Sequence, residues 1–256
     1  MLRNRLIFSL IYNGGAFMQS RNFRLQRVGD ITWLERNYKF QQISFSLDEL
    51  IILNASRDDK NIVDFSQIVK RLVDGVFIPV AAGGGIRTLE DADLLFRNGA
   101  DKVVLNTSLH TNPNLPREIA EKYGNQSLVA SIDYKVLSGK AVVFIRDGSE
   151  NTNIELLDYL NIVKELGVGE IIINSIDRDG TGFGYDLSTF KNVSNVVGMP
   201  LILMGGAGNE MHFREGLDQD NVSAVCTANL FNFIGDGLPK ARQCMLDKGY
   251  NLAVWK

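Results

Sequence analysis

Short, continuously apolar runs recur eight times along the chain, each bounded by residues typical of turns. They lie near residues 5–11, 49–54, 77–82, 102–106, 127–133, 170–175, 200–204 and 222–228. Runs of this length without alternation are typical of parallel strands that are buried on both faces. Because the segments between them have helical periodicity, the pattern predicts eight strands that alternate with helices.

Two of the predicted helices have recognisable ends. Thr88 begins the sequence Thr-Leu-Glu-Asp, which resembles a capping box, and Gly99 stands where that helix is expected to end. Asn153 is expected to cap a later helix that Gly167 closes. The apolar face of this later helix is predicted to comprise Leu156, Leu157, Leu160, Val163 and Leu166.

The two halves of the chain repeat one another at an offset of about 121 residues. Residues 79–85 align with 200–206, and residues 49–54 align with 170–175. Such duplication favours an eight-stranded (β/α)8 TIM barrel with an internal two-fold repeat over an open doubly wound sheet, which needs no matching halves. We expect one barrel domain over residues 1–256, with half-barrels of about 1–125 and 126–256.

The aligned halves differ where their first strands end. The second half ends this strand in Asp133, whereas the first half ends it in Ile11. In a TIM barrel the active site lies at the carboxyl ends of the strands, so Asp133 is a candidate general acid or base. The alternative is a helix cap or a solvated acid. Asp179, which follows the sixth strand, is a second candidate, although Asp-Gly pairs also shape turns.

Glycine-rich turns follow the third and the seventh predicted strands. Their backbone N–H groups could approach an anion closely, so each turn is a candidate phosphate cradle, and two cradles would hold a substrate phosphorylated at both ends. The alternative is that the glycines serve only tight turns. The candidate phosphate-binding residues are Gly84, Gly85, Asn106, Thr107, Gly180, Gly205, Gly206, Ala228 and Asn229.

The opposite ends of four strands carry two cations and two anions, namely Arg5, Glu49, Lys102 and Glu170. Converging on the barrel mouth, they could close a ring of salt bridges. The alternative is a set of exposed charges that contribute little energy. The segment 12–28, which contains Asn-Gly-Gly and several arginines, predicts a mobile loop over the other end of the barrel.

Composition narrows the possible partners. With 256 residues and 45% hydrophobic content the chain can bury a large core, and a net charge of −3 offers no general attraction to nucleic acid or to a membrane surface. Only two cysteines occur, which indicates a reducing compartment, and Cys226 lies in an apolar run typical of a buried side chain. We expect a cytoplasmic protein without a cofactor. His110 and His212 have no partner at metal-ligand spacing, so we expect no metal.

Several motifs together resemble the histidine-biosynthesis barrel family, which contains the cyclase subunit of imidazole glycerol phosphate synthase. They are Gly-Gly-Gly-Ile at 83–86, Gly-Ala-Asp-Lys-Val at 99–103, Ser-Ile-Asp-Arg-Asp-Gly-Thr at 175–181 and Gly-Gly-Ala-Gly at 205–208. The resemblance implies a class I glutaminase partner on the N-terminal face of the barrel. It also implies that the four charges gate an ammonia tunnel, that Asp101 contacts the partner, and that Asp133 and Asp179 match catalytic carboxylates.

The chain departs from the family pattern at the chemical end. Ile11 stands where the family has its first catalytic aspartate, Gln19 where it has a loop lysine, Asn54 where it has a second-strand aspartate, and Asn229 where a small hydroxyl residue is usual. An alkyl side chain cannot exchange a proton, so imidazole ring closure should be crippled.

Three functional hypotheses follow. The leading one is a subunit that passes ammonia from the glutaminase to a separate amidotransferase, for amidation of an N-acetylated sugar in lipopolysaccharide or O-antigen synthesis, as the resemblance to divergent members of the family implies. The second is an authentic cyclase of histidine biosynthesis. The third is a non-enzymatic barrel that binds a phosphorylated metabolite.

Overall fold

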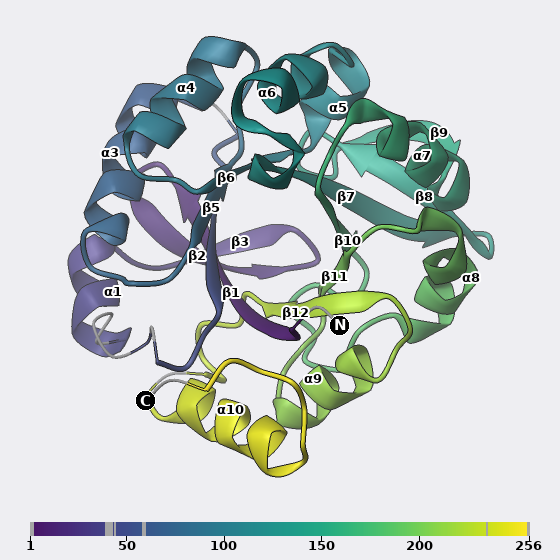
Figure 1. Ribbon diagram of the computed structural model, residues 1–256. Coiled ribbons are helices and arrows are strands. Elements are labelled where there is room, and N and C mark those ends of the chain that lie inside the picture. The colour runs from purple at the N-terminus through teal and green to yellow at the C-terminus, as the bar shows by residue number, and fades with distance from the viewer. Residues whose placement is uncertain (1–2, 39–42, 44, 58–59, 234, 255–256) are drawn as a thin grey trace.

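The computed structural model describes residues 3–38, 43, 45–57, 60–233 and 235–254. Within them, eight parallel strands close into a barrel, because β10 pairs with β7 and β12 pairs with β1 (Figure 1). The barrel strands are β1 (Arg5–Asn13), β4 (Glu49–Asn54), β5 (Val80–Gly83), β6 (Lys102–Leu105), β7 (Leu128–Leu137), β10 (Glu170–Ser175), β11 (Leu201–Met204) and β12 (Val222–Thr227). The predicted (β/α)8 fold is confirmed.

Helices form the outer ring of the molecule (Figure 1). They are α1 (Ile31–Tyr38), α3 (Ile62–Val73), α4 (Leu89–Arg97), α5 (Thr107–Thr111), α6 (Leu115–Tyr123), α7 (Leu156–Val163), α8 (Leu187–Val197), α9 (Glu210–Leu217) and α10 (Gly237–Asp247), with 3-10 turns η1 (Asn125–Ser127) and η2 (Lys164–Leu166). Their apolar faces pack on the outside of the barrel, where Phe65, Phe190 and Phe213 are buried. No helix of the described part of the chain is long and apolar enough to cross a membrane.

A second, smaller apolar cluster fills the inside of the barrel. Along β1, Leu6, Phe8 and Leu10 belong to the outer core, whereas Ile7 belongs to the inner cluster. Successive side chains of a strand point to opposite faces, so Arg5 lies on the inward side as Ile7 does. The inner cluster comprises Ile7, Ile51, Ala81, Val104, Val129, Ile172, Ile202, Met204, Ala224 and Cys226. The prediction that Cys226 is a buried apolar side chain is confirmed.

The predicted ends of α4 are confirmed, whereas the predicted start of α7 is wrong. The Thr88 hydroxyl accepts from the Asp91 N–H at 3.3 Å, and the Asp91 carboxylate accepts from the Thr88 N–H at 3.1 Å, which completes a capping box. Gly99 follows α4 at φ +94°. Asn153 lies instead in β9 (Glu150–Glu155) at φ +59°, and α7 begins later, with Glu155 at its cap.

The buried apolar face of α7 is also narrower than predicted. Leu157 is 37% exposed, whereas Leu156, Leu160 and Val163 are buried and Leu166 is buried in η2. Gly167 ends this unit in a left-handed conformation at φ +79°, as predicted. Leu157 lies about 100° from Leu156 around the helix axis, at the edge of the face that Leu156, Leu160 and Val163 form, and is therefore partly exposed.

Two strands of the barrel continue beyond its carboxyl end and recruit antiparallel ribbons. β1 pairs with β2 (Ala16–Arg21), which pairs with β3 (Arg24–Gly29), so the prediction of a mobile loop over residues 12–28 is wrong. β7 pairs with β8 (Lys140–Ile145), which pairs with β9. The β2–β3 ribbon crosses the opening of the barrel (Figure 1).

The capping box of α4 provides a test of local stability. Thr88→Ala removes the hydroxyl acceptor of the helix start and should lower the free energy of unfolding by about 1 kcal/mol. Thr111→Ala, at an exposed helix end where the hydroxyl only donates to the Thr107 carbonyl, is the matched control and should change it less. Chemical denaturation measures both, and equal losses would contradict a capping role for Thr88.

Candidate functional site

The four predicted gate residues meet in one closed ring at the amino ends of β1, β4, β6 and β10. Arg5 contacts Glu49 at 2.7 Å and Glu170 at 2.5 Å. Lys102 contacts the same two carboxylates at 3.0 and 2.9 Å. The charges therefore alternate around the ring, and each ion touches two partners of opposite sign.

Burial makes this ring sensitive to the loss of any member. The Glu49 side chain is 2% exposed and that of Glu170 is 15% exposed. Burial raises the pKa of Glu49, and the attraction of Lys102 and Arg5 does not fully offset it. Burial also acts to raise the pKa of Glu170, but Arg5 and Lys102 outweigh it and the pKa is lowered. Removing one partner of a buried pair leaves an uncompensated charge, so the ring is stable only as a whole.

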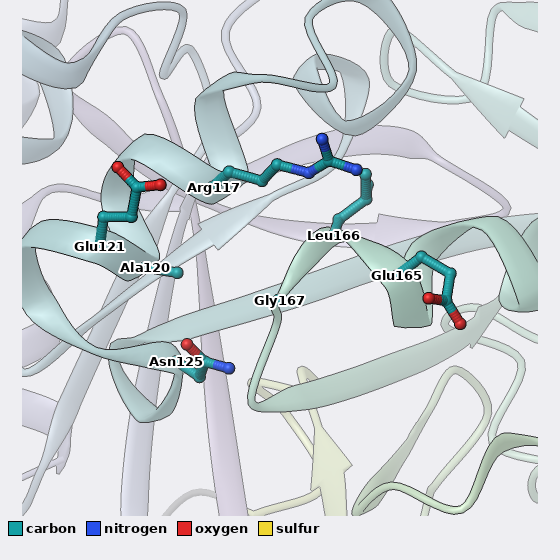
Figure 2. Close-up of a pocket in the computed structure, with 7 residues that line it drawn as sticks. All are labelled: Arg117, Ala120, Glu121, Asn125, Glu165, Leu166 and Gly167. Carbon is teal, nitrogen blue, oxygen red and sulfur yellow. The ribbon is translucent and has the colours of Figure 1, made fainter.

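Asp101 also lies at this end of the barrel. It is exposed, and its carboxylate accepts a hydrogen bond from the Val80 N–H at 2.8 Å, which links the starts of β5 and β6. A hollow of about 250 Å³ opens on the same side, before β7 and β10 (Figure 2). Arg117 and Glu121 of α6 and Glu165 and Leu166 of η2 line it, and the Arg117 side chain extends toward Leu166 (Figure 2). This hollow is therefore remote from the carboxyl ends of the strands.

At the carboxyl end, Asp133 is held between two amides. It accepts from Asn174 at 2.8 Å and from Asn106 at 3.0 Å, and it is 7% exposed. Burial raises the pKa of Asp133 to about 7, against the lowering effect of the Asn174 hydrogen bond, with smaller contributions from neighbouring charges. A carboxyl group with this pKa can accept or release a proton near neutral pH.

Asp179 anchors the β2–β3 ribbon. Its Oδ2 atom accepts from the Ser20 hydroxyl at 2.5 Å and from the Phe23 N–H at 3.0 Å. Burial raises the pKa of Asp179, and these two hydrogen bonds act to lower it. Gly180 permits the close approach of the ribbon, since a Cβ there would lie 2.0 Å from the Ser20 carbonyl oxygen. Asp179 is thus engaged in holding the ribbon down.

Ile11 belongs to an apolar cluster beneath the same ribbon. It packs with Ala16 and Met18, and Leu25 and Ala228 contact the cluster. The residue is 8% exposed. A second link joins the ribbon to the barrel, because the Leu230 N–H donates to the Gln19 side-chain oxygen at 2.9 Å.

The first glycine cradle lies between β5 and α4. A Cβ on Gly84 would lie 2.2 Å from the Asn54 carbonyl oxygen, so the chains approach there as only glycine allows. Asn106 is committed to Asp133 and to the Ser131 carbonyl, and Thr107 accepts from the Arg146 N–H at 3.0 Å. The turn 146–149 contacts Thr107 through the Arg146 N–H, and Asp147 of the same turn contacts Lys60, which lies beside Gly85.

The second cradle surrounds a small cavity at the ends of β11 and β12. Gly206 lies at φ +108°, and a Cβ there would lie 2.1 Å from the Gly184 carbonyl oxygen. The Asn229 side-chain oxygen accepts from the N–H groups of Phe231 and Asn232 at 3.1 and 3.0 Å, so it shapes the turn. The predicted residues that line this cavity are Asp179, Gly180, Gly205, Gly206, Ala228 and Asn229.

Sequence reasoning missed three polar residues at this end. Ser20 lies in the segment predicted as a loop, and the sequence patterns assign no role to Lys60 or Asp147, although Lys60 contacts Asp147 at 2.7 Å. Lys60 and Asp147 are 87 positions apart, and each lies in a connecting segment without a motif. A prediction of the β8–β9 ribbon from the sequence would have placed Asp147 near the carboxyl ends of the strands.

These features define a (β/α)8 barrel with a closed ring of four charges at the amino ends of its strands and a buried carboxyl group, that of Asp133, at the opposite end, where the glycine-rich turns also lie. Comparison with known proteins specifies the family. The family described as "Histidine biosynthesis protein" matches residues 19–235. The chain belongs to this family, among the barrels related to subunit HisF of imidazole glycerol phosphate synthase.

Three relatives span nearly the whole chain. One, named "Putative imidazole glycerol phosphate synthase subunit hisF2", from Parasynechococcus marenigrum (strain WH8102), is 45% identical over 256 residues, covering 100% of this chain and 95% of the relative. Proteins named "Imidazole glycerol phosphate synthase subunit HisF" from Pyrobaculum aerophilum and Alkaliphilus metalliredigens are 36% and 34% identical. The alignments cover 94% and 96% of this chain, and 93% and 96% of those relatives.

The raised pKa of Asp133 predicts a pH-dependent stability. Because the folded-state pKa of about 7 exceeds the ordinary value of 3.8, the contribution of Asp133 is fully present below the ordinary pKa and is lost as pH rises through 7. Between pH 5 and pH 8 the chain should lose about 3 kcal/mol relative to Asp133→Asn. Denaturation of both proteins across this range measures the difference.

The control for this prediction is Asp177→Asn, at an exposed position on the same end of the barrel. Its stability curve measures the effect of removing an exposed carboxyl group. If the curves of Asp133→Asn and of the unchanged chain are parallel, Asp133 ionises as an ordinary carboxyl group.

Proposed function

We propose that the chain is the barrel subunit of a glutamine-dependent amidotransferase complex, which takes up ammonia released by a class I glutaminase. The relatives carry names that describe them as subunits, which supports an assembly with another chain. The glutaminase docks on the N-terminal face, where the exposed Asp101 is available for contact beside the charged ring.

The interior of the barrel supports a route for a small neutral molecule. Beyond the ring, the inward side chains are apolar, including Ile7, Ile51, Val104 and Ile172. Desolvation of an ion in such surroundings is costly, so neutral ammonia would pass where ammonium would not. In this proposal Arg5, Glu49, Lys102 and Glu170 act as the gate.

The observation that carries the proposal is the apolar environment of Ile11. Ring closure on a bisphosphate needs two opposed acid–base groups, and this position instead anchors the β2–β3 ribbon by packing against Ala16 and Met18. Asp133 and Asp179 are the catalytic candidates that remain, and Asp179 is bound to the ribbon. In this proposal the ammonia is passed to a separate amidotransferase, which amidates an N-acetylated sugar nucleotide in lipopolysaccharide or O-antigen synthesis, as the resemblance to divergent members of the family implies.

The glycine cradles in this proposal bind a phosphorylated small molecule. Backbone N–H groups around Gly84, Gly85, Gly205 and Gly206 can donate to phosphate oxygens. Thr107 adds a hydroxyl group at the first cradle. The second cradle also includes Asn229, whose side-chain nitrogen can donate.

The second candidate function is the cyclase reaction itself. It is favoured by the names of the relatives that are 36% and 34% identical and by Asp133, whose pKa of about 7 suits proton transfer. Growth of a cyclase-deficient histidine auxotroph carrying this gene would support it, and failure to grow with normal expression of the chain would count against it.

Stimulation of glutamine hydrolysis tests the channelling function. The class I glutaminase encoded nearest to this gene, purified with the chain, should hydrolyse glutamine faster than it does alone. Lys102→Met leaves Glu49 and Glu170 with one cation between them and should reduce this stimulation about tenfold. The result that contradicts the proposal is the lack of both a complex and any stimulation.

Lys122→Met is the matched control for the ring variant. Lys122 also pairs with a carboxylate, that of Asp93, but the pair lies on the outer helices and the lysine side chain is 45% exposed. Its loss should leave the stimulation unchanged. An equal effect of both substitutions would show that the ring has no special role.

Restoring the missing groups tests why ring closure is lost. Ile11→Asp with Gln19→Lys should produce cyclase turnover with an ammonium salt, about a hundredfold above the control Ile11→Asn with Gln19→Lys. The reason is that aspartate exchanges a proton whereas asparagine does not. Complete inactivity of a folded double variant would show that the substrate pocket itself has changed.

A further inference from the structure

The first glycine cradle holds a lysine that neither the motifs nor the relatives' names point to. Lys60 lies between β4 and α3, and its side chain is 19% exposed. Its ammonium group donates to the Asn54 carbonyl oxygen at 3.2 Å, and this oxygen lies against Gly84. The stem of Lys60 passes Gly85, where a Cβ would lie 2.9 Å from the Lys60 Cβ atom. A cation thus lies directly beside the backbone of the cradle.

A carboxylate contacts this lysine. Asp147, in the turn between β8 and β9, contacts the Lys60 ammonium at 2.7 Å. The preceding residue, Arg146, donates its N–H to the Thr107 hydroxyl at 3.0 Å. The lysine and the threonine, which would both face a bound anion, are therefore both engaged by one turn.

This turn has a backbone that is unfavourable for its residues. Arg146, Asp147 and Gly148 lie at φ +52°, +55° and +74°, so three successive residues are left-handed and two of them are not glycine. Such conformations persist where tertiary contacts hold them. The contacts here are those to Lys60 and Thr107, together with the packing of Gly148 against Phe23.

We propose that Lys60 is the cation that binds a phosphoryl group of a phosphorylated small molecule in the first cradle, and that Asp147 occupies this position until the phosphate displaces it. The inference rests on the phosphate cradle of the proposed function and deepens it. A phosphate carries more charge than a carboxylate and three acceptor oxygens. It can therefore accept from Lys60, Thr107 and the cradle N–H groups together, whereas Asp147 contacts only the lysine among them.

Displacement of Asp147 connects the cradle to the rest of the carboxyl end. Gly148 lies against Phe23 at the tip of the β2–β3 ribbon, and the Phe23 N–H donates to Asp179. Movement of the turn would therefore loosen one contact of the ribbon. Binding of the phosphorylated molecule is thereby coupled to the position of the β2–β3 ribbon, which crosses the opening of the barrel (Figure 1).

Titration with inorganic phosphate tests the inference in the full chain. Asp147→Asn removes the competing carboxylate and should bind phosphate about tenfold more tightly than the unchanged chain. Lys60→Gln should bind it about tenfold more weakly. The control is Lys140→Gln, which breaks the exposed pair with Glu155 on the β8–β9 ribbon, the ribbon that carries Asp147, and should leave the affinity for phosphate unchanged. Calorimetry, with sodium chloride at equal ionic strength as the reference, measures the affinities.

The outcomes separate this inference from the proposed function. Equal phosphate affinity in the unchanged chain, Asp147→Asn and Lys60→Gln would overturn the role of Lys60. Absence of phosphate binding in the unchanged chain and in Asp147→Asn would overturn the cradle as well. Stimulation of the glutaminase by the unchanged chain is measured separately, in the absence of phosphate, so a failure of channelling is distinguished from a failure of phosphate binding.

Discussion

Side chains of each barrel strand point alternately into and out of the barrel, and the arrangement of functional residues in this protein depends on this alternation. On β1 it sends Arg5, Ile7 and Ile11 to the inside and Phe8 to the helices. The same alternation in the other strands stacks a charged ring, an apolar layer and a polar end along one axis. Each layer therefore consists of residues far apart in sequence, and a change in one layer need not disturb the others.

The two ends of the barrel balance burial against charge in different ways. At the amino end each of the four ions has two partners of opposite sign, so desolvation is offset within the ring. At the carboxyl end Asp133 has only amide donors, and burial prevails, which raises its pKa to about 7. The amino end therefore has a complete ring of ion pairs. At the carboxyl end Asp133 is the carboxyl group that can transfer a proton and is not hydrogen-bonded to the β2–β3 ribbon.

The sequence predicts the barrel well because buried parallel strands are continuous apolar runs, and it predicts the ring because each of its charges stands at the start of such a run. It fails at the carboxyl end for physical reasons. The β2–β3 ribbon is stabilised by Met18 packing on Ile11 and by Ser20 bonding to Asp179, contacts that no local pattern reveals. The Lys60–Asp147 pair likewise joins two loops that only the folded barrel brings together. Asn153 likewise lies in β9, at the register shift of the β8–β9 pairing, and not at the start of a helix.

The central claim is that one of the two acid–base groups needed for ring closure is missing at the carboxyl end of the barrel, at Ile11, while the ring of four charges at the amino end is complete. The most direct measurement supplies the unmodified chain with the bisphosphate intermediate of the cyclase reaction and an ammonium salt, and follows formation of the imidazole product. Our account predicts no turnover above the rate without protein. Efficient turnover, at a rate comparable to that of an authentic cyclase assayed in parallel, would contradict it.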